Sequence, residues 1–333
     1  MLTDRLTQTR EENHDLLAKQ ITTSLGLIRK DIDDQTQFYK FENGLPFATI
    51  EFKPDVSIGL NYPDNVYKFF PKINPICPDN ICRPKGDTTF FTSAGVQHIE
   101  TMINRGEDIK YTAFQVAQPV IRSQFMDKVK EGTSTSFINF SAVSICSSHN
   151  EFTSTSSNFI QLILSQGVPA AELEFDIENV QDKWGWREFN KSLLTVYFKG
   201  NELGECVYIH DYPISENEKV SITDLGFGVE RLNWAINPND HYFSEFDQYY
   251  IGLEENEAAP ILDCVRSMVL IAGEGVLPSS HDHGYRLRQI SKRFVERNFK
   301  YKLKIDELID ISYDYWCKWG LEPQSNKTTV LKV

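Results

Sequence analysis

The sequence has no apolar run that approaches the ~20 residues needed to cross a bilayer, which argues against a membrane-spanning protein. Residues 1–15 mix both charge signs and lack an apolar signal core, so export is not expected. Six cysteines among 333 residues are too thinly spread for a disulfide framework, and they are typical of a cytoplasmic protein. The sequence also contains neither a P-loop nor a G-x-S-x-G motif, which argues against P-loop nucleotidases and serine hydrolases.

Positive charge is scarce as well: the formal net charge of −13 argues against a protein that coats DNA. Residues 286–304 are the exception, with eight basic residues and one acid, Glu296. This segment could contact a polyanion such as a tRNA acceptor stem. Leu287, Ile290 and Phe294 recur in it at helical spacing, so an ordinary helix with a solvated basic face is an equal alternative.

Hydrophobic periodicity places strands in the middle of the chain and helices at its ends. We expect an amphipathic helix over residues 5–30 and an almost wholly helical region beyond residue 254. Strands are predicted over residues 112–121, 135–145, 172–177, 193–198, 205–211 and 220–225, and helices over 156–166 and 229–236. This order predicts an α+β fold, with an antiparallel sheet flanked by helices in residues 1–250 and a helical domain in residues 251–333.

The densest motif is DLGFGVERL at residues 224–232. Gly226 and Gly228 follow an apolar strand, and in a turn there they would let the backbone pass close under a flat ligand. Arg231, on the first turn of the next helix, could reach a phosphate or stack on a base, with Glu230 orienting it. A strand–turn–helix corner whose glycines serve only packing is the alternative interpretation.

This segment resembles motif 3 of the class II aminoacyl-tRNA synthetases, and the aspartate two residues before the first glycine is similar to the alanyl type. The resemblance continues in chain order. Residues 87–95 resemble the motif 1 region, residues 118–122 resemble the start of motif 2, and residues 263–288 follow the family's helical region. It covers roughly residues 85–300 and leaves residues 1–84 unassigned. It implies a class II synthetase-like catalytic domain.

The resemblance assigns ATP binding and catalysis to Arg122, from motif 2, and Arg231, from motif 3. Activation of an amino acid builds negative charge on a phosphoryl group, which arginines and Mg²⁺ would stabilise. The resemblance further implies that Gly226 and Gly228 lie under the nucleotide. Phe137 could stack on adenine, although it also suits an ordinary core position.

Two carboxylates receive roles from the same resemblance. Asp224 would bind the ammonium group of the amino acid, although an aspartate at a strand end can also serve as a cap. Glu205 would hold the magnesium ion. A solvated glutamate on an edge strand is an equally good interpretation of Glu205.

Several departures from the family fall in the expected substrate pocket. Residues 133–139 replace a segment that carries a histidine and a glutamate. Residues 183–190, which include Trp184, replace the loop that closes over the amino acid. Tyr208 stands where the family has an asparagine. We therefore assign Trp184 and Tyr208, together with Asp224, to substrate binding, and we expect that the amino acid need not be alanine.

The expected function is formation of an aminoacyl-adenylate from ATP, followed by transfer to an acceptor: tRNA, a carrier-protein thiol or a small amine. A homodimer is possible, and no membrane partner is expected. Because the chain ends at Val333, a stand-alone paralogue is favoured over a housekeeping synthetase. The alternatives are a catalytically inactive regulatory or binding subunit, which the altered motif 2 favours, and an RNA-binding module that uses only the basic helix.

Overall fold

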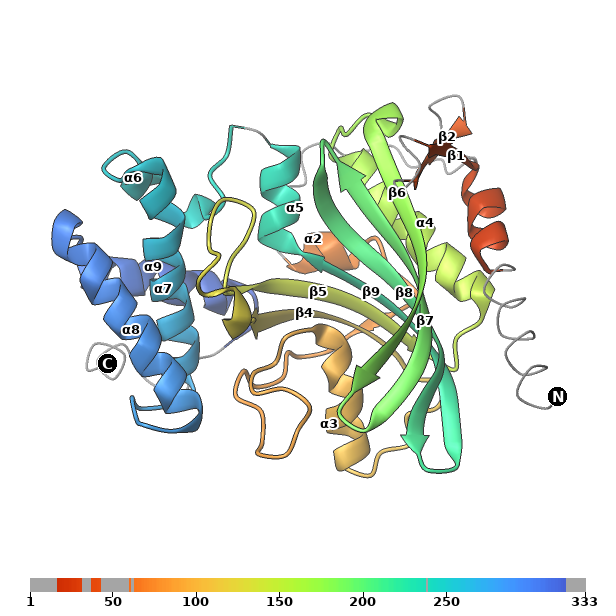
Figure 1. Ribbon diagram of the computed structural model, residues 1–333, viewed down its shortest axis with the longest axis horizontal. Coiled ribbons are helices and arrows are strands. Elements are labelled where there is room, and N and C mark those ends of the chain that lie inside the picture. Colours follow the sequence, from red (N-terminus) through yellow and green to blue (C-terminus); the bar gives the residue numbers. More distant parts are fainter. Residues whose placement is uncertain (1–16, 32–36, 43–59, 61–62, 238, 322–333) are drawn as a thin grey trace.

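The computed structural model contains one large β-sheet, with helices on both of its faces and at one end (Figure 1). The structure describes residues 17–31, 37–42, 60, 63–237 and 239–321. In these residues nine strands form the sheet, in the spatial order β1-β2-β6-β7-β8-β9-β5-β4-β3. Their bounds are β1 Leu27–Asp31, β2 Gln37–Phe41, β3 Asn74–Pro75, β4 Ala113–Ile121, β5 Ser136–Ile145, β6 Leu173–Trp184, β7 Arg187–Phe198, β8 Asn201–Ser215 and β9 Glu218–Gly228.

Neighbouring strands pair antiparallel, except that β3 pairs parallel to β4. Strands β6 to β9 follow one another as a meander. Lys199 and Gly200 connect β7 to β8 with φ angles of 50° and 76°, and positive φ at both turn residues matches the twist of a tight hairpin. The sheet is therefore built mostly from local hairpins, and β5 joins it beside β9, a strand that lies far along the chain.

Side chains alternate between the two faces of the sheet, and each face has its own cover. On one face, Leu225 and Phe227 belong to a hydrophobic core shared with α4 (His149–Ser165). On the other face, Val143 and Ile222 pack with Ile99 of α3 (His98–Asn104). The part of this second face that α3 leaves uncovered carries the cavity described below.

Helices α7, α8 and α9 lie together at the left of Figure 1, beyond the end of β5 where the strand begins. Asp263 of α7 accepts hydrogen bonds from the backbone N–H groups of Thr135, at 2.8 Å, and Ser136, at 3.2 Å. This helical region therefore holds the first residues of β5 in place. The remaining helices are α2 Pro63–Tyr67, α5 Val229–Ile236, α6 Asp247–Tyr250, α7 Glu255–Gly273, α8 Asp282–Tyr301 and α9 Ile305–Lys318.

The α+β class predicted from the sequence is confirmed, with a mixed rather than a purely antiparallel sheet. Two local predictions are wrong. Residues 17–25 are helical as expected, but Gly26 has a positive φ and residues 27–31 form β1; the predicted residues 5–16 lie outside the described part. The expected glycine turn is also absent, because β9 continues as extended strand through Gly226 and Gly228. The division of the chain at residue 250 stays a prediction.

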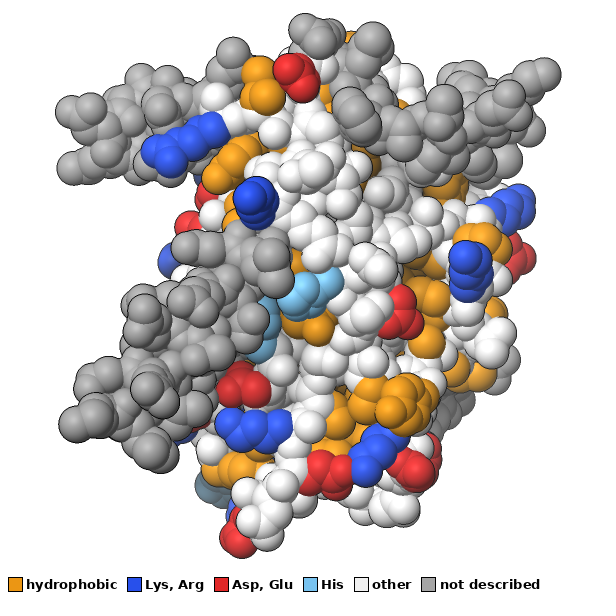
Figure 2. All heavy atoms as spheres, turned by 90° about the vertical axis from the view of Figure 1, so that its right-hand side faces the viewer, with side chains coloured by type: hydrophobic (Ala, Val, Ile, Leu, Met, Phe, Trp, Pro, Cys, Tyr) orange, Lys and Arg blue, Asp and Glu red, His pale blue; other side chains and the backbone are white. Residues whose placement is uncertain are grey.

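Figure 2 views the molecule from the right-hand side of Figure 1. Acidic and basic side chains are interspersed there, so the described residues of that face form no extended surface of a single charge sign. Among the helices of the described ranges, each is too short or too polar to cross a membrane.

Candidate functional site

A cavity of about 300 Å³ lies on the face of the sheet that α3 leaves uncovered. Eight of the nine site residues predicted from the sequence line it, and they come from β5, β6, β8, β9, α5 and the segment after β4. These eight are Arg122, Phe137, Trp184, Glu205, Asp224, Gly226, Gly228 and Arg231. The structure thus brings residues that are more than 100 positions apart in the sequence into one cavity.

The two predicted arginines reach this cavity from different elements. Arg122 follows β4, donates a hydrogen bond from Nε to the carbonyl of Ser93 at 3.1 Å, and lies 4.9 Å above the ring of Phe137. Arg231, on α5, donates from Nε to the carbonyl of Gly132 at 3.1 Å and from Nη1 to Glu202 Oε1 at 3.0 Å. Burial lowers the pKa of Arg122, and the nearby charge of Arg231 lowers it further. Two guanidinium groups that line one cavity favour a bound anion, which would relieve their repulsion.

Glycines 226 and 228 form part of the cavity floor, and packing does not require either of them. A Cβ at Gly226 would lie 3.7 Å from the nearest atom, Asn139 Nδ2, and one at Gly228 would lie 3.4 Å from the Phe137 ring. Gly204 contrasts with them, because a Cβ there would lie 2.6 Å from the Cβ of Phe227, on the opposite face. Side chains at 226 and 228 would enter the cavity instead of the core, which favours a ligand floor over a purely structural role.

Asp224 and Glu205 contribute negative charge to the same cavity. Burial raises the pKa of Asp224 to about 7, and the charge of Glu205 adds to the shift. Oxygen Oδ1 of Asp224 is buried and has no hydrogen-bond partner within the described residues. A buried acceptor without a partner is costly. A ligand ammonium group would satisfy it.

The described residues contain no group of three His, Cys, Asp or Glu side chains that could hold a metal ion by themselves. Mg²⁺ in nucleotide sites, however, commonly takes only one or two carboxylates together with the phosphates. Glu205 and Glu202 both line the cavity. Burial raises the pKa of Glu205, and repulsion from Glu202 raises it further. These two carboxylates fit a magnesium ion that arrives with a nucleotide.

Tyr208 does not reach the cavity. Its side chain is 6% exposed, its hydroxyl donates to the carbonyl of Ser147 at 2.9 Å, and its ring packs edge-on against His149 of α4. The reason is strand alternation: Glu205 and Val207 of β8 point into the cavity, so Tyr208 must point to the other face. The structure therefore does not bring Tyr208 together with the other predicted site residues.

Glu230 does not orient Arg231 as expected. Its carboxylate accepts hydrogen bonds from the backbone N–H of Ile138, at 2.9 Å, and from the hydroxyl of Tyr315, at 2.8 Å, and it pairs with the buried Arg266. Adjacent residues on a helix point in different directions, so Arg231 enters the cavity while Glu230 faces the core. Arg231 is oriented instead by Gly132 and Glu202.

Sequence reasoning missed six polar residues that line the cavity: Ser134, Tyr242, Lys191, Glu202, Asn139 and Ser141. The last two lie directly opposite Gly228 and Gly226 in the pairing of β5 with β9. Period-two alternation from the predicted strand residue Phe137 could have indicated Asn139 and Ser141. No local signal identifies Lys191 or Glu202, because the place of each side chain in the cavity depends on the register of its strand against a neighbouring strand.

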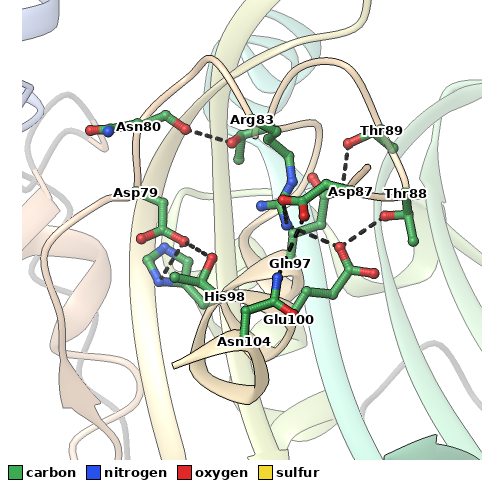
Figure 3. A network of polar contacts seen from close by, with 12 residues as sticks. Asp79, Asn80, Arg83, Asp87, Thr88, Thr89, Gln97, His98, Glu100 and Asn104 are labelled. Atoms are coloured by element: carbon green, nitrogen blue, oxygen red, sulfur yellow. Dashed lines mark hydrogen bonds and ion pairs between the residues drawn. The ribbon is translucent and has the colours of Figure 1, made fainter. Parts of the chain in front are cut away.

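A polar network supports the segment that forms one wall of the cavity (Figure 3). The buried Arg83 pairs with Asp87 at 2.9 Å and with Glu100 of α3 at 3.0 Å, and Glu100 also accepts from the hydroxyl of Thr88 at 2.8 Å. These contacts anchor residues 87–95 on α3. The same segment supplies the carbonyl of Ser93 to Arg122 and places Ala94 in the cavity wall. The network thus supports a binding surface without entering it.

The basic residues of the segment 286–304 largely have acidic partners. Five of the eight form ion pairs: Lys292 with Glu296, Arg293 with Asp127, Arg297 with Glu257, Lys300 with Glu254 and Lys304 with Glu307. These pairs reduce the positive field that the sequence suggested. Contact of this segment with tRNA stays a prediction.

Comparison with known sequences finds partial matches to alanine–tRNA ligases. The alanine–tRNA ligase of Cenarchaeum symbiosum (strain A) is 25% identical to this chain, in a match that covers 46% of the chain and 23% of that ligase. Alanine–tRNA ligases of two Coxiella burnetii strains are each 31% identical over 88 residues, which is 23% of the chain and 10% of the ligase. No known family model matches the chain.

The chain is thus distantly similar to alanine–tRNA ligases over part of its length, and the matches span less than a quarter of each of these ligases. This similarity supports the predicted resemblance at the level of a synthetase-like protein.

Proposed function

We propose that the protein activates an amino acid with ATP, forming an aminoacyl-adenylate that is passed to an acceptor. One observation carries the proposal. Arg122 and Arg231, 109 positions apart in the sequence, line a single cavity together with a glycine floor. Such a pair of guanidinium groups suits the α-phosphate and the leaving pyrophosphate of ATP. The distant similarity to alanine–tRNA ligases supports the same class of reaction.

In the proposed reaction, a carboxylate oxygen of the amino acid attacks the α-phosphorus of ATP, and the bond to pyrophosphate breaks. Arg122 and Arg231 stabilise the charge that develops on the phosphoryl oxygens. Asp224 accepts the ammonium group of the amino acid and so aims its carboxylate at the phosphorus. Glu205, with Glu202, would hold the magnesium ion that neutralises phosphate charge.

ATP–pyrophosphate exchange with each of the twenty amino acids tests this proposal. We expect exchange with at least one of them. Arg122→Ala and Arg231→Ala should each lower its rate by about 10²–10³-fold, as when one transition-state donor is removed. Arg105→Ala is the matched control, because Arg105 lies on the surface outside the cavity and its side chain is 66% exposed. Wild-type rates in both cavity variants would refute the assignment of the arginines.

A second candidate is a catalytically inactive protein that binds an amino acid or a nucleotide. It is favoured by the ion pair between Arg231 and Glu202, which engages one of the two arginines, and by Arg122 lying over the Phe137 ring. Isothermal titration with ATP and amino acids separates the two candidates. Binding without exchange for any amino acid supports the inactive protein, whereas exchange excludes it.

The final acceptor follows from a separate experiment. tRNA, a carrier-protein thiol and a small amine are all compatible with an activated carboxyl group. Transfer of radiolabelled amino acid to total tRNA, compared with transfer to hydroxylamine, distinguishes tRNA charging from release of a free adenylate. A mobility shift with tRNA at two salt concentrations measures direct binding, which should weaken steeply with salt.

A further inference from the structure

The register of the sheet divides the cavity into two ends. At one end, Gly228 lies opposite Asn139. Two residues earlier in β9, Gly226 lies opposite Glu205 of β8. Two residues earlier again, Asp224 lies opposite Val207. Each step of two residues advances about 7 Å along the strand. If the nucleotide lies over the two glycines, the amino-acid end of the cavity lies at Asp224 and beyond.

Lys191 stands at that far end. It lies on β7 opposite Ile209, which pairs in turn with Ile222 of β9, two residues beyond Asp224. Its side chain lines the cavity and is only 18% exposed. A lysine so largely buried is uncommon and needs partners for its charge. If the ammonium group of an amino acid binds Asp224, Lys191 is therefore placed to contact the side chain of that amino acid.

The ammonium group of Lys191 still has hydrogen-bonding capacity. Within the described ranges its single hydrogen-bond partner is Asp182 Oδ2, at 2.7 Å, and an ammonium group carries three N–H donors. Asp182 does not line the cavity, so of the two paired side chains only that of Lys191 faces a bound ligand. Two donors remain for a ligand.

The surroundings decide which acceptor these donors suit. Asp182 already balances the charge of Lys191, Asp224 lies at the same end of the cavity, and Glu205 lies one two-residue step away. A second carboxylate brought by the ligand would meet repulsion from these groups. The nearby walls include Ala94, Val96, Trp184 and Val207, which offer no further cation. A neutral oxygen acceptor fits this environment better than an anionic one.

We propose that this end of the cavity selects an amino acid with a neutral oxygen acceptor in its side chain, a hydroxyl or a carboxamide, and that Lys191 donates to that oxygen. The inference rests on the proposed amino-acid activation and names its substrate class. Lys191 is then the specificity-determining residue, and alanine is a poor substrate because its methyl group leaves the donors without a partner.

The test compares exchange rates for serine, threonine, asparagine and glutamine with those for alanine, valine, aspartate and glutamate. We expect at least one neutral polar amino acid to exceed alanine by about 10–100-fold in kcat/KM, the worth of a hydrogen bond to a charged donor. Lys191→Met keeps the length of the side chain and removes the donors. It should lower the ratio of kcat/KM for the preferred neutral polar amino acid to that for alanine by about 10–100-fold.

Asp182→Asn is the matched control, because it removes the ion pair but keeps the donors of Lys191. If Lys191 serves only to pair with Asp182, both variants will change the rates alike. If Lys191 contacts the side chain, the preference will survive in Asp182→Asn and disappear in Lys191→Met. Circular dichroism and thermal melts establish that each variant is folded.

Several outcomes overturn the inference. A wild-type preference for alanine or valine would remove the need for a donor, and a preference for aspartate or glutamate would refute the neutral class. An unchanged ratio in Lys191→Met would refute the role of Lys191. Isothermal titration of the same amino acids distinguishes failure of the proposed function: selective binding without exchange refutes activation alone, and no binding of any amino acid refutes both.

Discussion

Replacement of Asp224 by asparagine separates the proposed role of this carboxylate in binding from its effect on stability. Burial raises its pKa from 3.8 to about 7 in the folded protein. A carboxyl group whose folded pKa lies above its unfolded pKa favours folding fully at low pH, below about pH 4. This contribution is lost as the pH rises through 7. Asparagine does not ionise, so Asp224→Asn should lack this part of the pH dependence.

The magnitude follows from the size of the shift. A difference of about three pH units corresponds to about 4 kcal/mol at 1.36 kcal/mol per unit. This is an upper limit, because the side chain is only partly shielded from water. We expect Asp224→Asn to be more stable than the wild type by about 1–3 kcal/mol at pH 8, and by less than about 1 kcal/mol at pH 4.5.

Urea denaturation at the two pH values, in metal-free buffer, measures this difference. The comparison of variant with wild type cancels other titrating groups, such as Asp263, whose pKa burial raises to about 6. Asp108→Asn, an exposed loop variant, controls for the loss of one charge. A variant that is less stable than the wild type at pH 8 would refute the account of Asp224 as a carboxylate whose ionised form destabilises the fold.

Binding should change in the opposite direction. The ammonium group of an amino acid pairs with the ionised carboxylate, so the affinity of the wild type should rise between pH 6 and pH 8. Asp224→Asn should bind about 10–100-fold more weakly at pH 8 and lose this pH dependence. Isothermal titration measures both effects. If Asp224→Asn is stabilised but binds the amino acid as tightly as the wild type, Asp224 does not bind the ammonium group, although its effect on stability would still be explained by burial.

Further predictions concern the cavity floor and the buried charges behind it. Gly226→Ala should change the free energy of unfolding by less than about 1 kcal/mol but weaken ATP binding. Gly204→Ala should destabilise the protein by about 1–3 kcal/mol through overpacking. Denaturation and nucleotide titration measure both effects, and two variants that behave alike would contradict this prediction. Arg266→Met should destabilise by about 3–5 kcal/mol, because it leaves the buried Glu230 and the partly buried Glu245 without their common cation. Adding Glu230→Gln to that variant should recover part of the loss, and a strictly additive double variant would show that the charges do not interact.

Local patterns were sufficient for much of the secondary structure. The predicted strands 112–121 and 135–145 correspond to β4 and β5, and α5 occupies the predicted residues 229–236. Predictions failed where a local pattern was ambiguous. Apolar residues at helical spacing continued past Gly26, and only the pairing of β1 with β2 made residues 27–31 a strand.

Local sequence identified part of the candidate site, because a short run around β9 and α5 carries an aspartate, two glycines and an arginine at fixed spacing. Tertiary structure decided which side chains meet. It brought Arg122 to Arg231, turned Tyr208 to the opposite face and placed Lys191 at the end of the cavity. The physical reason is the two-residue alternation of a strand: a shift of one position moves a side chain to the other face, and only pairing with neighbouring strands sets that register.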